Sequence, residues 1–182
     1  MASGLITDFY IDARPVYLRG EGQFLIGELF YEELVRLEQN GERFDACGGM
    51  ATGAIPLACA LSNAAFRRGR ELPCLFVRKN AKDHGLEASV EGMKALKRNS
   101  HVLMLEDVVT TAGSSIKAYD AFSLEGLVVK HLLALVDREQ GGRGALSERG
   151  ISMHALFTLN ELREMSDVDC HERTLSERAR EV

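Results

Sequence analysis

The 182-residue sequence lacks tryptophan, has three prolines, and contains no apolar run of membrane-spanning length. Its longest apolar run, from Ala54 to Leu61, is far shorter than the roughly 20 residues that a membrane helix needs. The first residues also lack the basic-then-apolar pattern of a secretory signal. We therefore expect a soluble, cytoplasmic protein.

Recognisable cysteine patterns are missing as well. The four cysteines, at positions 47, 59, 74 and 170, show neither a C-x-x-C spacing nor the histidine arrangement of a zinc site. The sequence therefore predicts neither structural zinc nor a disulfide framework, and the thiols are expected to be ordinary buried or surface groups.

An excess of basic charge is the third absence. The chain has 27 acidic and 22 basic residues, a formal charge of −5, which argues against a surface that binds nucleic acid or an anionic membrane. An anionic ligand must then be held by local groups. With 46% hydrophobic residues, the chain can form one compact domain, which we expect over residues 1–165. Residues 166–182 are charged and aperiodic, and are expected to be a loose tail.

Apolar spacing predicts alternating helices and strands. Apolar residues recur at helical spacing over residues 23–37, before an Asn-Gly stop signal. Short, mostly unalternating apolar runs indicate strands covered on both faces, at residues 44–47, 73–77, 101–105, 127–136 and 152–157. Further helices are expected at residues 55–66, 114–124 and 141–149, and a last short one after Thr158, where Glu161 completes a capping box. The 114–124 helix opens on serines suited to capping. This order predicts an α/β fold with a parallel sheet flanked by helices.

The segment E-D-V-V-T-T-A-G-S-S, residues 106–115, lies between a predicted strand and a predicted helix. Ligands of open parallel sheets bind beyond the carboxyl ends of the strands, and hydroxyls with backbone N–H groups at a helix N-terminus can cradle a phosphate. The carboxylates of Glu106 and Asp107 can accept hydrogen bonds from ribose hydroxyls or hold the water shell of Mg²⁺. Taken alone, the same residues are equally consistent with a simple turn and helix cap. Neither a G-K-[ST] ending nor a G-x-G-x-x-G motif occurs.

Two other segments follow predicted strands. R-K-N-A-K-D-H-G, residues 78–85, gathers three cations and a histidine. It can act as an anion clamp that closes over a pyrophosphate leaving group, although a charged loop of this kind is by itself more often only solvated. Arg138 follows the strand that ends near Val136, and an arginine there can donate paired hydrogen bonds to a carboxylate. Alone, it would more often form a surface salt bridge.

Together these motifs resemble a known family over residues 3–162. The order of strand, acidic pair, two aliphatics, T-T-x-G-S and helix is similar to the phosphoribosyl pyrophosphate (PRPP) motif of the type I phosphoribosyltransferases. R-K-x-x-K-x-H-G and V-D-R are similar to the mobile loop and the base-binding segment of the orotate phosphoribosyltransferases. The glycine-containing loop at 47–56 looks like the pyrophosphate-side loop, and residues 3–14 resemble part of the hood over the base.

The resemblance implies an α/β fold of the type I phosphoribosyltransferase kind, with a shortened N-terminal hood that includes residues 1–22. It implies transfer of the phosphoribosyl group from PRPP to orotate in pyrimidine synthesis, with Mg²⁺ carried by the pyrophosphate and not bound directly by the protein. Lys82, His84 and Asp107 would be catalytic, and Thr110 and Arg138 would bind orotate. The residues implied in PRPP binding are Arg78, Lys79, Lys82, His84, Glu106, Asp107, Val108, Val109, Thr110, Thr111, Ala112, Gly113 and Ser114. A homodimer is also implied, in which the 78–92 loop reaches the neighbouring active site.

The sequence departs from the family pattern at several positions. Ala112 stands where a glycine is common, and a positive φ there would cost about 1 kcal/mol. Ala2 and Gly53 stand where some members carry lysine. Two alternatives therefore stay open: a phosphoribosyltransferase for a different base, and a non-catalytic regulatory protein that senses PRPP. Lys82 and His84 count against a sensor, which has no leaving group to activate.

Overall fold

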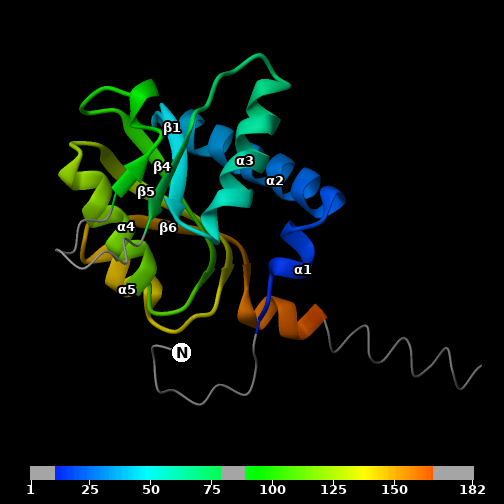
Figure 1. The fold of residues 1–182 in the computed structure, drawn as a ribbon. Coiled ribbons are helices and arrows are strands. Elements are labelled where there is room, and N and C mark those ends of the chain that lie inside the picture. The colour runs from blue at the N-terminus through cyan, green and yellow to red at the C-terminus, as the bar shows by residue number, and fades with distance from the viewer. Residues whose placement is uncertain (1–10, 79–88, 166–182) are drawn as a thin grey trace, which may run out of the picture.

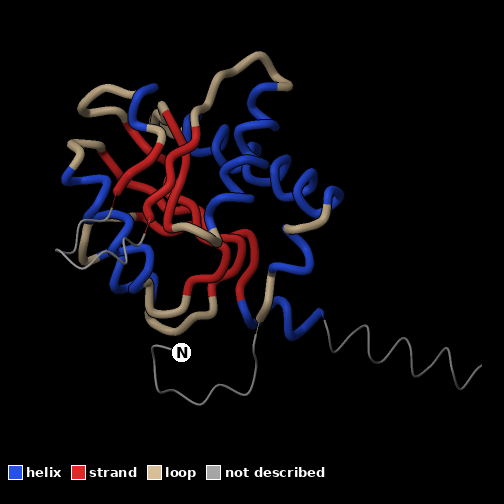
Figure 2. Tube along the Cα trace, viewed as in Figure 1, coloured by secondary structure: helices blue, strands red, loops and turns tan. Residues whose placement is uncertain are grey.

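A computed structural model of the protein describes residues 11–78 and 89–165, which form one twisted sheet between two helical layers (Figures 1 and 2). The six strands are β1 (Ala46–Met50), β2 (Cys74–Arg78), β3 (Ser89–Glu91), β4 (His101–Val109), β5 (Val128–Asp137) and β6 (Ser152–Thr158). The helices are α1 (Arg14–Tyr17), α2 (Gly20–Gln39), α3 (Ala54–Phe66), α4 (Gly113–Leu124) and α5 (Gly142–Ser147), with a 3₁₀ turn at Met93–Ala95. Residues 159–165 are also helical. The predicted α/β architecture is confirmed.

The sheet has the strand order β3-β2-β1-β4-β5-β6. All neighbouring strands are parallel except β3, which pairs antiparallel with β2. The sequence did not predict β3, because three residues are too few to show a strand period. The expected purely parallel sheet therefore gains an antiparallel edge strand.

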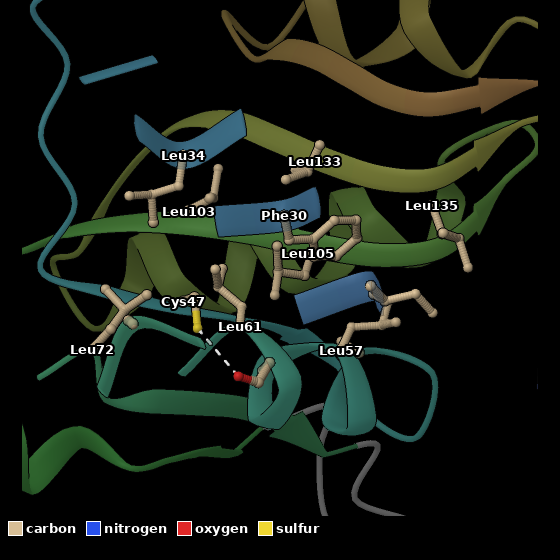
Figure 3. Close-up of a cluster of buried hydrophobic side chains, with 14 of the residues drawn as sticks. Phe30, Leu34, Cys47, Leu57, Leu61, Leu72, Leu103, Leu105, Leu133 and Leu135 are labelled. Carbon is tan, nitrogen blue, oxygen red and sulfur yellow. Dashed lines mark hydrogen bonds between the residues drawn. The ribbon is translucent and has the colours of Figure 1, made fainter. Parts of the chain in front are cut away.

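Each face of the sheet is covered by its own hydrophobic core. Helices α2 and α3 cover one face, and α4 and α5 cover the other (Figure 1). In β4, Leu103 and Leu105 belong to the α2/α3 core, where they lie among the side chains of Figure 3, whereas Val102 and Met104 belong to the α4/α5 core. Because successive residues of a strand point to opposite faces, a strand buried on both sides is apolar without alternation.

Strand β1 begins two residues later than predicted and continues through Gly48 and Gly49 to Met50. The sequence placed these two glycines in a ligand-facing loop. A Cβ at Gly48 would lie 2.0 Å from the Leu75 carbonyl oxygen, and one at Gly49 would lie 2.2 Å from that of Leu105. Both glycines therefore permit close approach between neighbouring strands, and not directly to a ligand.

Strand β4 runs four residues beyond its predicted end, so that Glu106 and Asp107 lie within the strand. The ladder with β5 continues through the pairs Val108↔Val136 and Val109↔Asp137, which extends the strand past the last aliphatic run. The boundaries of the other predicted strands and helices agree with the structure to within a few residues, whereas the short helix α1 was not predicted.

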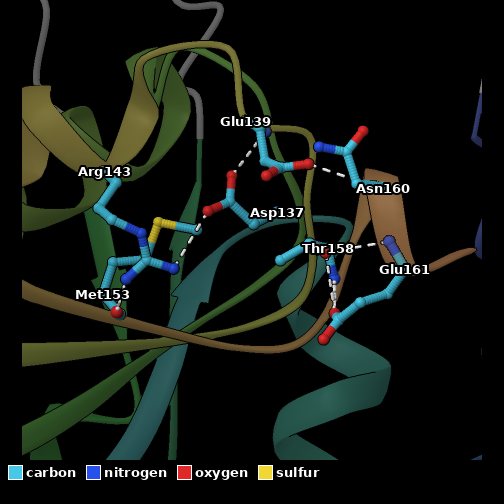
Figure 4. Close-up of polar contacts among 7 residues, drawn as sticks. All are labelled: Asp137, Glu139, Arg143, Met153, Thr158, Asn160 and Glu161. Carbon is cyan, nitrogen blue, oxygen red and sulfur yellow. Dashed lines mark hydrogen bonds and ion pairs between the residues drawn. The ribbon is translucent and has the colours of Figure 1, made fainter.

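The predicted capping box at the last helix is confirmed (Figure 4). The Thr158 N–H donates to Glu161 Oε2 at 2.7 Å, and the Glu161 N–H donates to Thr158 Oγ1 at 3.2 Å. Residues 166–182, the predicted tail, lie outside the described residues. Among residues 11–78 and 89–165, no helix has both the length and the apolar character needed to cross a membrane.

Candidate active site

A pocket of about 400 Å³ opens at the carboxyl ends of β1, β4 and β5. Five segments contribute to it: the residues before and within α1, the end of β1 with the loop after it, the end of β4 with the loop after it, the first turn of α4 and the residue after β5. Its lining residues are Ile11, Asp12, Ala13, Arg14, Tyr17, Met50, Ala51, Thr52, Gly53, Glu106, Asp107, Val108, Thr110, Ser114 and Arg138. Thus the structure brings predicted residues from the phosphate loop, the acidic pair and the V-D-R segment into one cavity.

Glu106 ties the first turn of α4 to β4. The hydroxyls of Ser114 and Ser115 each donate to Glu106 Oε2 at 2.9 Å. Burial raises the pKa of Glu106 to about 7, with the neighbouring Asp107 carboxylate adding to the effect and the two serine hydroxyls opposing it. The serines were predicted to cap the helix, and this prediction is wrong: no side chain in the described part of the chain caps α4, whose N-cap residue is Ala112.

Ala112 has a left-handed backbone conformation, with φ 61° and ψ 16°. The positive φ that the family's common glycine would favour is therefore adopted here by alanine. The sharp turn starts α4 directly at the pocket. The N–H groups of the first turn of a helix have no intrahelical acceptor, so they are available to an anion at this end.

The loop between β4 and α4 is packed against the start of α5. The Gly142 N–H donates to the Thr110 carbonyl oxygen at 3.0 Å, and an added Cβ at Gly142 would lie 2.5 Å from Val109 Cγ1. Only a residue without a side chain permits this approach. Gly142 thus holds the candidate phosphate loop in place through its contact with Thr110. No sequence pattern indicated this role.

Asp107 is held on three sides. The Tyr17 hydroxyl donates to Oδ2 at 3.1 Å, and the Val108 N–H donates to Oδ1 at 2.8 Å. On the third side, a Cβ at Gly53 would lie 2.8 Å from Oδ1, so a side chain there would displace the carboxylate. A lysine at position 53, as in some family members, would require a different arrangement of this contact.

Tyr17 was not predicted as a site residue. Burial raises its pKa to about 12, and the Asp107 carboxylate adds to the shift. The hydroxyl therefore stays protonated and can donate a hydrogen bond. No spacing pattern marks this tyrosine, because the resemblance in the hood ends at Arg14. Its only signal is that it follows that segment closely.

Arg138 is buried at the end of β5, and the backbone on both sides of it is fixed. Its own N–H donates to the Val109 carbonyl oxygen at 2.9 Å. Asp137 Oδ1 accepts the Glu139 N–H at 2.8 Å, and Asp137 Oδ2 accepts from Arg143 Nη2 at 3.1 Å (Figure 4). Glu139 in turn accepts the Asn160 N–H at 3.1 Å, which joins this loop to the last helix.

The other predicted site residues divide into four groups. Val109 and Ala112 are buried in the α4/α5 core, and Thr111 and Gly113 flank the loop residues that line the pocket. Arg78, an exposed residue at the end of β2, forms a 2.6 Å ion pair with Glu91 of β3 and is not among the described residues lining the pocket. Lys79, Lys82 and His84 lie outside the described residues.

The charged oxygens of the pocket suit a hard cation. The described residues contain no group of three or more histidine, cysteine or acidic side chains that could hold a metal ion by themselves. Glu106 and Asp107 nevertheless supply carboxylate oxygens, the donors that Mg²⁺ prefers, and Mg²⁺ commonly keeps several water ligands. Their chemistry therefore fits an ion that brings most of its ligands with it.

Relatives of the chain are found by sequence, although no family model matches it. It is 42% identical over 158 residues to the orotate phosphoribosyltransferase of Sorangium cellulosum, covering 87% of this chain and 80% of that protein. It is 37% identical over 162 residues to that of Aquifex aeolicus, covering 89% and 85%. The chain belongs to the orotate phosphoribosyltransferase family. The resemblance inferred from the motifs is thereby confirmed.

Solved structures of the family share the fold. The orotate phosphoribosyltransferase of Aeropyrum pernix matches with a TM-score of 0.72 and 29% identity, covering 91% of this chain and 88% of that one. The Mycobacterium tuberculosis enzyme in complex with PRPP matches with a TM-score of 0.67 and 29% identity, covering 84% and 82%. The type I phosphoribosyltransferase fold is therefore confirmed for this chain.

Proposed function

We propose that the protein transfers the phosphoribosyl group from PRPP to orotate, forming orotidine 5′-monophosphate and pyrophosphate. The observation that carries this proposal is the joining of the phosphate loop, Asp107 and Arg138 in one pocket of a chain that belongs to the orotate phosphoribosyltransferase family. Charged substrates of this kind also fit the cytoplasmic location expected from the sequence.

The phosphate end of PRPP would lie at the start of α4. Residues 110–114 offer hydroxyls and first-turn N–H groups, and hydrogen bonds to a charged group contribute about 1.5–3 kcal/mol each. The Asp107 carboxylate would accept hydrogen bonds from the ribose hydroxyls. Glu106, whose Oε2 already accepts from two serines, would contribute mainly by holding the loop in shape.

The reaction breaks the bond between the anomeric carbon and pyrophosphate. Positive charge develops on the ribose and negative charge on the leaving group, so catalysis consists of orienting two ligands and stabilising separated charges. Arg78, Lys79, Lys82 and His84 would meet the pyrophosphate, with Lys82 as the principal catalytic group. Mg²⁺, carried by the pyrophosphate, would neutralise part of its charge, and the carboxylates of Glu106 and Asp107 would face its water ligands.

Arg138 would bind the carboxylate of orotate. A guanidinium can donate two parallel hydrogen bonds to a carboxylate, a geometry that lysine cannot reproduce. Arg138 lies beside the phosphate loop because its N–H is bonded to the Val109 carbonyl, and Thr110 lines the same pocket. The two ligands would thus be held on neighbouring strand ends.

A homodimer would complete the site if the 78–92 loop reaches the neighbouring subunit. Several large apolar side chains are exposed on α1 and α2, and they support an interface on this side of the molecule. The exposed residues are Val16, Phe24, Leu25 and Leu29, together with Leu18 between the helices. Analytical ultracentrifugation tests this part: a monomer at micromolar concentration would contradict it.

The reaction is tested by following the loss of orotate absorbance in the presence of PRPP and Mg²⁺. We expect turnover with orotate and none with adenine, hypoxanthine or uracil. Turnover with another base alone would identify a different phosphoribosyltransferase. PRPP binding without turnover of any base would identify a sensor.

A further inference from the structure

Three cysteines converge where α3 covers β1 and β2. Cys47 and Cys74 are register partners on these parallel strands, so their side chains project to the same face. Cys59 belongs to α3, which packs on that face. Figure 3 shows Cys47 beside this helix, with its thiol donating to the Ala58 carbonyl oxygen at 3.7 Å. As expected, the three are free thiols at buried and surface positions, but no sequence pattern indicated that the fold brings them together.

Cys74 is the centre of this cluster. The thiols of Cys47 and Cys59 and the Ser62 hydroxyl all act on its pKa. These donors, Cys47 foremost, lower the pKa of the Cys74 thiol, although partial burial opposes them. Cys47 Sγ also lies 3.7 Å from the Ala58 carbonyl oxygen, which is an alternative acceptor for its proton.

The pKa values of the other two thiols, Cys47 and Cys59, are raised instead. Contact with Cys74 raises the pKa of Cys47 well above its ordinary value, with burial as the next cause. Burial is the first cause that raises the pKa of Cys59, and Cys74 adds to it. A thiolate therefore forms preferentially on Cys74, and thiolates are the nucleophilic form of cysteine.

Accessibility distinguishes the two possible partners of Cys74. Cys47 is fully buried, whereas Cys59 is exposed and Cys74 is partly exposed. Cys59 also lines a groove of about 430 Å³. Arg14, Tyr17 and Thr52 line both this groove and the candidate active site, so small solutes can approach Cys59 from that side.

We propose that Cys74 and Cys59 form an oxidisable pair that reacts with hydroperoxides, with Cys74 as the nucleophile and Cys59 as the resolving thiol. The Cys74 thiolate attacks a peroxide oxygen, the O–O bond breaks, and the leaving oxygen takes a proton from water. Cys74 is oxidised to a sulfenic acid and the peroxide is reduced to an alcohol or water. The Cys59 sulfur then attacks the Cys74 sulfur, and the hydroxyl leaves as water with the Cys59 proton.

The test uses the full-length chain with Cys170→Ser, treated with equimolar hydrogen peroxide, alkylated and analysed by peptide mass spectrometry. We expect a Cys59–Cys74 disulfide that dithiothreitol reverses, with Cys47 alkylated after unfolding. A Cys47–Cys74 disulfide, or complete alkylation of all three cysteines, would overturn the proposal. Orotate turnover is not the readout, so the result is independent of the proposed function.

Single variants separate the two roles. Cys59→Ser should stop at a Cys74 sulfenic acid that dimedone traps, and Cys74→Ser should leave Cys59 reduced under the same treatment. Equal oxidation of Cys59 in Cys74→Ser would contradict the assigned order.

Ser62→Ala provides a variant that keeps all thiols. It should shift the pH profile of Cys74 alkylation to higher pH while circular dichroism stays native, because one hydroxyl donor is lost. Ser123→Ala, at an exposed position of α4, is the matched control and should leave the profile unchanged. An unchanged profile in Ser62→Ala would show that the Ser62 hydroxyl does not stabilise the Cys74 thiolate.

Discussion

Tyr17 and Asp107 are 90 residues apart in the sequence, yet the Tyr17 hydroxyl donates to Asp107 Oδ2 at 3.1 Å. This contact fastens α1 to the end of β4 and makes the segment before α2 a wall of the pocket. It also orients the carboxylate that we assign to the ribose hydroxyls.

Tyr17→Phe removes this hydrogen bond and keeps the ring. A hydrogen bond to a charged group contributes about 1.5–3 kcal/mol, so we expect at least about a tenfold rise in the KM for PRPP. Tyr31→Phe, on α2 away from the pocket, is the control and should behave as wild type. Steady-state kinetics at saturating orotate measure both, and an unchanged KM for PRPP in Tyr17→Phe would remove this role.

Lys82→Ala separates action on the leaving group from binding of the base. If Lys82 stabilises charge on the departing pyrophosphate, kcat should fall far more than orotate binding weakens. Lys94→Ala, at an exposed 3₁₀ turn, supplies a matched loss of charge. An unchanged kcat in Lys82→Ala would exclude the catalytic assignment.

Arg138→Lys keeps the charge but loses the paired donor geometry. We expect the KM for orotate to rise by about tenfold or more, while the KM for PRPP stays near that of wild type. Arg149→Lys, on an exposed ion pair with Asp120, should leave both constants unchanged. Equal rises in both KM values would instead indicate a general disturbance of the loop.

Ala112→Gly should be close to neutral for stability. Relief of the left-handed conformation should stabilise the folded protein by about 1–2 kcal/mol. Two losses offset this gain: about 0.8 kcal/mol for the buried methyl group, and about 0.4–1 kcal/mol because the unfolded chain becomes more flexible. Ala118 is also buried but lies in the middle of α4, where there is no strain to relieve. Ala118→Gly should therefore lower the free energy of unfolding by more than about 1 kcal/mol. Urea unfolding compares them, and equal losses would contradict this interpretation.

Glu106 should give the protein a measurable pH dependence. Its pKa is raised from 4.5 to about 7 in the folded state, so the folded protein binds this proton more tightly than the unfolded chain does. The resulting stability is fully present below pH 4.5 and is lost as the pH rises through about 7. Glu106→Gln stays neutral and should not show this loss, so the difference in unfolding free energy between wild type and variant should change across this range.

Urea unfolding below pH 4.5 and above pH 7 measures that difference. Glu125→Gln, at an exposed position after α4, controls for the loss of one surface carboxylate. A difference between wild type and Glu106→Gln that is the same at both ends of the range would show that the proton on Glu106 is not coupled to folding.

The sequence predicted those parts of the fold that depend on local periodicity. The helix expected over residues 23–37 corresponds to α2, Gly20–Gln39, because its apolar residues repeat along one face. The capping box of Thr158 and Glu161 was also predictable, since both partners lie within one turn. The order of three motifs, the phosphate loop, the R-K-x-x-K-x-H-G segment and the V-D-R segment, indicated the family.

Tertiary contacts determined what could not be predicted. The end of β4 depends on pairing with β5, and the serines at the start of α4 bond to Glu106 because the buried carboxylate needs donors. Tyr17 reaches Asp107 from a distant segment, and Gly142 is required by an approach between two loops. None of these contacts leaves a spacing pattern in the sequence.

The position of the phosphate site can be seen in a crystal structure of the protein with PRPP and Mg²⁺. We expect the 5′-phosphate against the backbone of residues 110–114 and the ribose hydroxyls at Asp107. A structure with PRPP bound elsewhere, and the space between Asp107 and Ser114 without ligand, would contradict this expectation.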